Sequence, residues 1–225
     1  MGGATSTNGG SYTSGGAVAA GGTTAVLHTM IDDLEDGDGI IIPVDGRQNG
    51  YWYVFNDGTV TGTQLPQLAF GKVYINPQPI DDRPPSMYAA WTESSGFTDW
   101  GAGMGVYLNG SSGFYDAGKY SGITFWAKAE PGRSSVMRVN LSDSQTVPAG
   151  DICSGDKCYD HFGVTISNLS TSWQRYSYLW SDLGQEGWGV PQVSMINYKS
   201  LRGFEFSTQA DIDFGIYIDD LAFIP

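Results

Sequence analysis

The chain has 225 residues, which is enough for one sizeable core, and its 32 glycines, 13 tyrosines, 10 phenylalanines and 7 tryptophans favour turns and aromatic-rich strands. Its formal net charge is −13. This charge argues against a nucleic-acid or anionic-membrane partner, because phosphate binding needs clustered Lys and Arg. No apolar run approaches the roughly 20 residues that span a bilayer, so direct membrane insertion is not expected. The negative charge is compatible with neutral ligands and with cations.

The N-terminal segment is almost entirely Gly, Ser, Thr, Ala and Asn over residues 1–24. Such a composition buries too little surface to offset chain entropy, so we predict a flexible linker over 1–27 and a single domain over 28–225. Residues 1–24 lack the basic start and apolar stretch of a signal peptide. A linker connects a domain to something else, so we expect an upstream domain or a lipid anchor to precede Met1.

Two acidic clusters lie at opposite ends of the predicted domain. The segment "IDDLEDGDG" occupies 31–39 and "IYIDDLAF" occupies 216–223, and each places paired carboxylates among apolar residues. A solvated turn explains one such cluster. Its recurrence at both ends indicates a second hypothesis, in which the two clusters share one role.

Between these clusters, apolar residues alternate with period two rather than 3.6. The alternating segments are 104–108, 123–129, 137–143, 176–180, 204–206 and 214–220. Turn-rich stretches separate them, and no helical pattern intervenes. Many short alternating strands predict an all-β fold, an antiparallel β-sandwich of jelly-roll type.

The outward positions of these strands carry groups that suit sugars. Alternation directs Trp126, Arg138, Asn140 and Glu205 away from the core. Indole and phenol rings cover the apolar faces of sugars, while polar side chains hydrogen-bond their hydroxyls. If the strands are neighbours, these groups line one concave surface. The alternative for any one outward ring is burial beneath a loop.

Further candidate ligand-binding residues come from aromatic segments. In "NGYWYVFND" Tyr51 and Tyr53 face opposite to Trp52, and Tyr107 lies opposite to the apolar face of its strand. Trp91, Trp100 and Trp188 lie near glycines. Trp91 and Trp188 are retained as candidates, whereas Trp100 is expected to pack over bare backbone as a structural residue.

The two cysteines, Cys153 and Cys158, lie in one Gly/Asp-rich loop. A metal pair needs further ligands and only His161 is near, so we predict a local disulfide, and with it a secreted or cell-surface location. Asp160 and His161 follow the stapled loop and are therefore added to the candidate ligand-binding residues. Simple packing explains His161 equally well.

Catalytic motifs are not evident in the sequence. The patterns GxSxG, HExxH and GxxxxGK[ST] are missing, and His28 and His161 are the only histidines. A carboxylate pair could still cleave polysaccharide, with Glu205 and either Asp143 or Asp160 as the acids. A hydrolase or lyase is therefore the alternative function. A third hypothesis is a structural subunit of a surface layer or fibre, in which the N-terminal segment is an assembly strand.

Several segments together resemble carbohydrate-binding modules of the β-sandwich type, most closely those of family 11 and related galactose-binding-like domains. The segments are "IDDLEDGDG", "YVFNDGT", "GFTDWGAGMGVYL", "DICSGDKCYDHFG", "WQRYSYLWSDLGQEGWG" and "IYIDDLAF". The resemblance spans about 28–225 and implies a jelly roll that binds a β-glucan or a similar polysaccharide without catalysis. The cysteine loop and the "QEGWG" turn depart from the family.

The same resemblance implies a structural calcium ion that joins the first and last strands. Carboxylate oxygens suit Ca²⁺, and Glu35, Asp38 and Asp220 are the matching acids. The segment "DGDGI" does not fit an EF-hand loop. Any calcium site is therefore expected to be assembled across strands, and a metal-free turn is the alternative.

Overall fold

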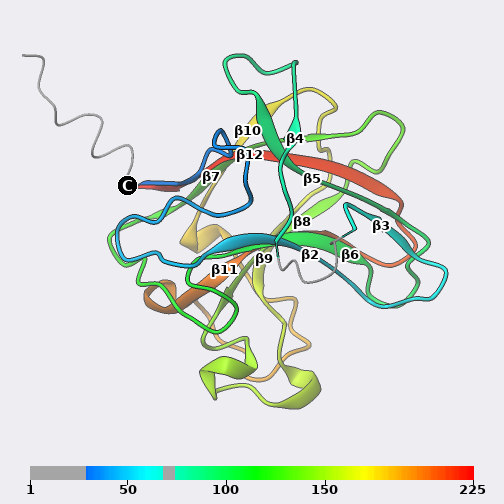
Figure 1. The fold of residues 1–225 in the computed structure, drawn as a ribbon. Coiled ribbons are helices and arrows are strands. Elements are labelled where there is room, and N and C mark those ends of the chain that lie inside the picture. Colours follow the sequence, from blue (N-terminus) through cyan, green and yellow to red (C-terminus); the bar gives the residue numbers. More distant parts are fainter. Residues whose placement is uncertain (1–28, 68–73) are drawn as a thin grey trace, which may run out of the picture.

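The computed structural model describes residues 29–67 and 74–225, so the predicted linker lies outside the described residues (Figure 1). Two antiparallel sheets face each other, which confirms the predicted jelly-roll sandwich. The helical elements described are single 3₁₀ turns: η1 (Pro148–Gly150), η2 (Gly155–Lys157), η3 (Trp180–Asp182) and η4 (Tyr198–Ser200). Within the described ranges, no helix is long and apolar enough to cross a membrane.

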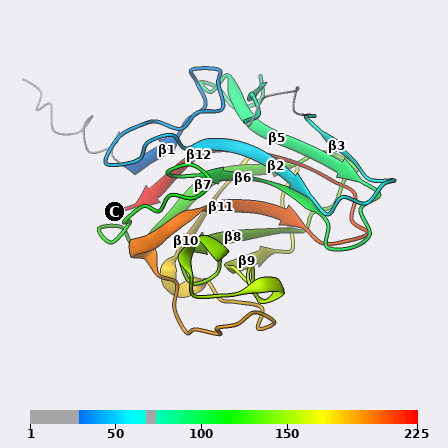
Figure 2. The ribbon, with the colours of Figure 1, turned by 60° about the horizontal axis from the view of Figure 1, so that its bottom comes forward.

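The strands divide unevenly between the two sheets, which we call sheet A and sheet B. Sheet A has the order β10 (Gln174–Leu179), β7 (Gly122–Ala129), β12 (Phe214–Ile224), β5 (Tyr88–Ser95) and β3 (Thr63–Leu65), with β1 (Met30–Asp32) paired to β12 and β4 (Gln78–Pro79) paired to β5. Sheet B has the order β2 (Tyr51–Asn56), β6 (Ala102–Tyr107), β11 (Leu201–Thr208), β8 (Met137–Asp143) and β9 (Phe162–Ile166), and its strands appear side by side in Figure 2.

The core lies between the sheets and is built from the alternating positions. Phe125 of β7 and Phe206 of β11 are both fully buried, and their ring centroids lie 5.1 Å apart across the sandwich. Trp52 of β2 stacks on Phe206 at 6.1 Å. Burying such rings is among the largest favourable terms in folding. The apolar positions of the alternating segments thus face the core, as the period of two predicts.

The first and last described strands, β1 and β12, are neighbours, with Met30 opposite Ala222. Asp32 of β1 is buried, and the oxygens of its carboxyl group accept the Trp52 indole N–H at 2.7 Å and the Leu34 amide at 3.1 Å. Burial raises the pKa of Asp32 to about 8, although these two hydrogen bonds act in the opposite direction.

This buried acid predicts a pH-dependent stability. The unfolded chain loses the Asp32 proton near pH 4, whereas the folded chain keeps it to about pH 8. The contribution of Asp32 to the free energy of unfolding therefore falls as the pH rises through this window, by up to ~1.4 kcal/mol per pH unit. Urea unfolding at about pH 5, 6 and 7 should show wild-type stability falling relative to Asp32→Asn. A difference that stays constant across these pH values would contradict the prediction.

Candidate functional site

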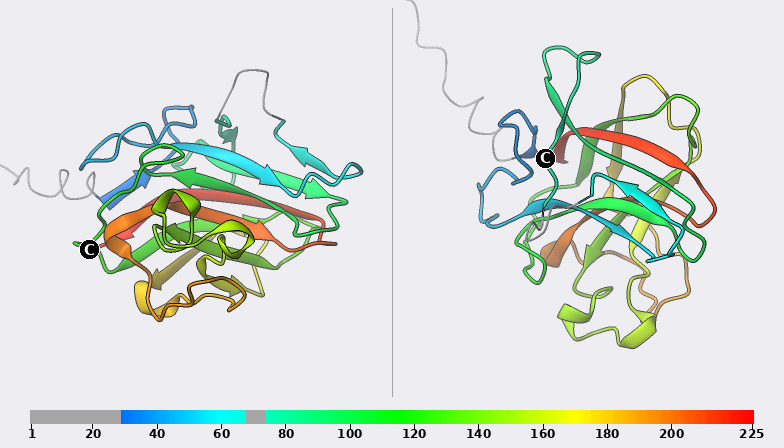
Figure 3. Two further views of the ribbon diagram at one scale, coloured as in Figure 1. Left: turned by 90° about the horizontal axis from the view of Figure 1, so that it is seen from below. Right: turned by 45° about the vertical axis from the view of Figure 1, so that its right-hand side comes forward.

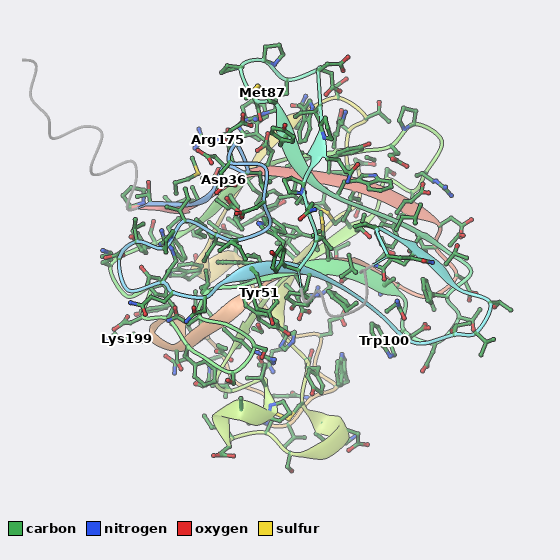
Figure 4. All side chains as sticks on the ribbon, viewed as in Figure 1. Asp36, Tyr51, Met87, Trp100, Arg175 and Lys199 are labelled. Carbon is green, nitrogen blue, oxygen red and sulfur yellow. A yellow bond between two sulfur atoms is a disulfide. The ribbon has the colours of Figure 1, made fainter. Side chains whose placement is uncertain are left out.

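The outer face of sheet B carries five aromatic side chains in contact with one another. We call them the aromatic strip: Tyr51, Tyr53 and Phe55 of β2, Tyr107 of β6, and Trp100 in the preceding loop. Tyr53 stacks on Tyr107 at 4.2 Å and lies 5.9 Å from Phe55, and Trp100 stacks on Phe55 at 6.1 Å. Tyr51 meets Tyr107 edge-on at 5.4 Å. Figure 4 labels Tyr51 and Trp100 near the two ends of the strip.

Glycines of β6 allow these rings to lie over the backbone. Tyr53 is paired with Gly105, and Phe55 with Gly103. A Cβ atom at Gly105 would lie 2.6 Å from the Tyr53 ring, and one at Gly103 would lie 2.8 Å from Phe55. The missing side chains thus leave room for the rings to cross the neighbouring strand. The Tyr53 ring thus lies against the Gly105 backbone and also stacks on the Tyr107 ring. Aromatic rings held at an outer face are the kind of surface on which a sugar ring stacks.

Polar side chains continue the row from the strip across sheet B. Glu205 of β11 is opposite Gly105 on one side and Asn140 of β8 on the other. The Tyr53 hydroxyl donates to Glu205 at 3.1 Å, and Arg138 Nε donates to Asn140 Oδ1 at 2.8 Å. Residues directly opposite on adjacent strands share a face, so the row runs beside the aromatic strip.

The protonation states of the tyrosines suit hydrogen bonding. Burial, together with the negative charge of Glu205, holds the pKa of Tyr53 well above its usual value, so the hydroxyl remains a donor. Burial also raises the pKa of Tyr107, although the guanidinium of Arg202, 4.9 Å from its ring centroid, opposes the shift. The face therefore combines neutral phenols with the carboxylate of Glu205 and the guanidinium groups of Arg138 and Arg202.

The predicted disulfide is confirmed, since Cys153 and Cys158 are bonded. Its loop, which includes η1 and η2, projects beyond the outer face of sheet B (Figure 1). Asp160 and His161 are only 2 % and 5 % exposed, so they do not present ligand contacts as predicted. His161 bonds Thr146 at 2.8 Å through Nδ1, and burial lowers its pKa. His161 Nε2 also lies 3.8 Å from Glu205 Oε1, so this buried ring lies against the acid of the polar row.

Trp188 remains exposed, and it lies beside the face. Asp160 accepts amide hydrogens from Glu186, Gly187 and Gly189, which fixes the turn that carries Trp188. Glu186 lies 3.8 Å from Arg138 on the outer face. The structure thus brings together Tyr51, Tyr53, Tyr107, Arg138, Asn140, Glu205 and Trp188 on one side of the molecule.

Trp91 and Trp126 are not part of this group, because β5 and β7 belong to sheet A. Their rings lie on the outer face of that sheet, on the opposite side of the sandwich. The indole of Trp91 donates to Glu130 at 2.7 Å, and Arg83 lies 4.8 Å from the Trp126 ring centroid. The prediction of one surface including Trp126 is wrong, because outward alternation does not say to which sheet a strand belongs.

Two members of the aromatic strip were missed from the sequence. Trp100 was expected to be structural, but it is 52 % exposed and stacks on Phe55. Phe55 follows Tyr51 and Tyr53 at the same period of two, so the alternation itself could have identified it. Trp100 lies in a loop, where periodicity gives no orientation.

The acids of the alternative enzymatic hypothesis are mostly engaged in structure. Asp143 is completely buried and accepts the amide hydrogens of Gln145 at 2.9 Å and Asn197 at 2.6 Å. Asp160 is held as described above. Glu205 is the acid of the three that reaches the outer face. Neither predicted pair therefore places two solvent-facing carboxylates together.

The two acidic clusters, in 31–39 and 216–223, are joined by the loop between β4 and β5. Glu35 accepts amide hydrogens from Met87 at 2.9 Å and Tyr88 at 3.2 Å. The Ser86 hydroxyl lies 2.8 Å from Glu35 and 2.6 Å from Asp219, and it donates to one of them at a time. One loop thus fastens both clusters, which answers why the domain begins and ends with the same pattern.

Arg83 supplies the positive charge at this junction. Its guanidinium pairs with both Asp219 and Asp220, where β12 has a register shift against β7 and Asp220 adopts a φ of 46°. Asp38 lies elsewhere in the turn and accepts the Ile40 amide at 2.7 Å. Within 29–67 and 74–225, no three His, Cys, Asp or Glu side chains are placed to hold a metal ion. Glu35, Asp38 and Asp220 do not form one calcium-binding set here, and calcium binding stays a prediction of the resemblance.

The chain thus forms a two-sheet jelly roll with an aromatic strip on the outer face of sheet B. No protein-family model and no curated protein sequence matches this chain. Solved structures do match the fold.

The family 11 carbohydrate-binding module from Clostridium thermocellum in complex with a β-1,3-1,4-mixed-linked tetrasaccharide is 14 % identical, with 87 % of this chain and 94 % of that chain covered and a TM-score of 0.51. The family 11 module of the cellulosomal cellulase Lic26A-Cel5E of the same organism is also 14 % identical, with 87 % of this chain and 92 % of that chain covered and a TM-score of 0.50. An exo-β-agarase gives 11 % identity over 88 % of this chain but 25 % of its own, with a TM-score of 0.52. The chain thus has the fold of family 11 modules, as the resemblance predicted.

Proposed function

We propose that this chain is a non-catalytic polysaccharide-binding module that takes a neutral β-glucan or a related glycan on the outer face of sheet B. The observation that carries the proposal is the aromatic strip beside the polar row of Glu205, Asn140 and Arg138. Stacking on the rings would supply most of the affinity, and the polar groups would orient the sugar hydroxyls.

The construction of the face supports this role. Tyr53 is fixed by Tyr107, by the backbone of Gly105 and by Glu205, so little side-chain freedom is left to lose on binding. A net charge of −13 disfavours polyanionic glycans and leaves neutral ones as ligands. A structure of the same fold holds a β-1,3-1,4-mixed-linked tetrasaccharide, which recommends that glycan as the first probe.

The test is calorimetric titration of the protein with mixed-linkage β-1,3-1,4-glucan and with its tetrasaccharide, together with electrophoresis through gels containing the glucan, cellulose derivatives or agarose. We expect saturable binding and retarded migration with at least one neutral glycan. Migration unchanged by every one of these glycans would overturn the proposal.

The alternative function is cleavage of polysaccharide, which the partial match to an exo-β-agarase keeps under test. We expect no release of reducing sugar from mixed-linkage glucan or agarose. Turnover that Glu205→Gln abolishes would replace the binding proposal by the enzymatic one.

We further propose a secreted or cell-surface location and a connection to an upstream domain or a lipid anchor. The Cys153–Cys158 disulfide supports an oxidising compartment. The surface-fibre hypothesis depends on residues 1–27, which lie outside the described residues. Proteolytic removal of that segment without loss of solubility or glycan binding would count against it.

A further inference from the structure

The turn that carries Trp188 lies at the opposite edge of sheet B from the aromatic strip. Gly184 pairs with Gly163 of β9, on the side of β9 that β8 does not occupy. The strip lies on β2 and β6 at the other edge, and β11 and β8 with the polar row lie between. Figure 3 shows the loops gathered beside this face in the view from below.

A buried carboxylate fixes this turn. Asp160 accepts the amide hydrogens of Glu186 at 2.8 Å, Gly187 at 2.9 Å and Gly189 at 2.9 Å. A Cβ atom at Gly189 would lie 2.4 Å from Asp160 Cβ, and Gly187 has a φ of +97°. The sequence "EGWG" is thus required for the backbone to wrap around Asp160. Three charge-assisted hydrogen bonds in a buried setting make a stiff turn.

The stiff turn holds an exposed ring. Trp188 is 48 % exposed, and its indole N–H lies 3.3 Å from Glu186 Oε2. A tryptophan needed only for packing would bury its ring and not leave half of it in water. Fixing an exposed ring in advance is useful for binding, because less conformational entropy is lost with the ligand.

We propose that Trp188 is a second aromatic contact for the polysaccharide, at the β9 edge of the face, and that Asp160 is the residue that positions it. This inference rests on the proposed function. A glycan that spans the three interstrand spacings from β6 to β9, about 14 Å, and continues over the turn beyond β9 would stack on the strip at one end and on Trp188 at the other. The polar row of Glu205, Asn140 and Arg138 would hydrogen-bond its middle.

The experiment is a double-mutant cycle on glucan affinity, measured by titration with mixed-linkage β-1,3-1,4-glucan. We expect Trp188→Ala to weaken binding about fivefold or more, and Asp160→Asn to weaken it by a similar factor, since an amide group would face the three N–H donors. The double variant should bind no more weakly than Trp188→Ala alone, because Asp160 acts through the ring. The matched control is Trp126→Ala on sheet A, which should bind as wild type does.

The measured affinities test the role of Trp188 and the role of Asp160 separately. Wild-type affinity in Trp188→Ala, with Tyr53→Ala strongly impaired, would overturn this inference and leave the proposed function intact. Additive losses in the double variant would overturn the positioning role of Asp160. If Asp160→Asn does not fold, Gly187→Val takes its place, because it strains the positive-φ turn without touching the buried carboxylate. Loss of binding by that variant supports the inference, and unchanged binding contradicts it.

Discussion

Replacing Tyr53 by alanine is expected to weaken mixed-linkage glucan binding at least about tenfold, or ~1.4 kcal/mol. Tyr53 is the centre of the aromatic strip, since its ring contacts those of Tyr51, Phe55 and Tyr107. Its removal eliminates a stacking surface, frees the neighbouring ring and exposes the backbone at Gly105. Central, well-packed aromatic residues commonly account for most of the affinity of a binding surface.

Two matched variants separate the causes of this effect. Tyr53→Phe keeps the ring and loses only the hydrogen bond to Glu205, so a reduction of about threefold or less is expected. Trp126→Ala removes an even larger aromatic side chain from the opposite sheet and should leave the titration unchanged. The assignment of the binding face fails if Trp126→Ala loses binding while Tyr53→Ala keeps it.

Replacing Arg83 by methionine is expected to lower the free energy of unfolding by about 3 kcal/mol. Asp219 is fully buried, and its side chain bonds Arg83 at 2.5 Å, the Ser86 hydroxyl at 2.6 Å and the Asp220 amide at 2.7 Å. Without the guanidinium, the carboxylates of Asp219 and Asp220 face each other without a cation. Methionine keeps an unbranched side chain of similar length, so the loss reports mainly the guanidinium, with its charge and its contact to the Trp126 ring at 4.8 Å.

Urea unfolding measures this loss, which corresponds to a fall in Tm of about 6–12 °C. The control is Arg133→Met, which breaks the more exposed ion pair with Glu93 at 3.1 Å and should cost no more than about 1 kcal/mol. Equal losses of unfolding free energy in the two variants would show that the Arg83 ion pairs stabilise the protein no more than an exposed ion pair does.

Thermal unfolding with and without a chelator tests the calcium site that the resemblance implies. If Glu35 and Asp220 bind calcium, a chelator added to calcium-saturated protein lowers Tm, because a ligand bound to the native state stabilises it. The engagement of Asp220 by Arg83, and of Glu35 by Ser86, Met87 and Tyr88, favours a Tm that changes by less than about 1 °C. A larger fall would establish the metal site.

Local patterns in the sequence were sufficient to predict the fold class, the core residues and the disulfide. Alternation alone separates Phe125 and Phe206, which are buried, from Trp126 and Glu205, which point outward. The Cys153–Cys158 pair needed only its spacing and the shortage of other metal ligands nearby. These features depend on neighbouring positions of one chain segment, so they are readable without knowing which strands pair.

The tertiary structure alone decided how these outward residues are grouped. Trp126 and Glu205 both point away from the core, yet they lie on opposite sides of the molecule, because β7 pairs with β12 and β11 pairs with β6. Long-range packing selects the partners of each strand, and an alternation with period two in the sequence does not identify those partners. The same holds for Asp160, which becomes buried only when a turn 26 residues away wraps around it, and for Arg83, whose positive charge reaches the acids of the last strand only after the sheet has formed.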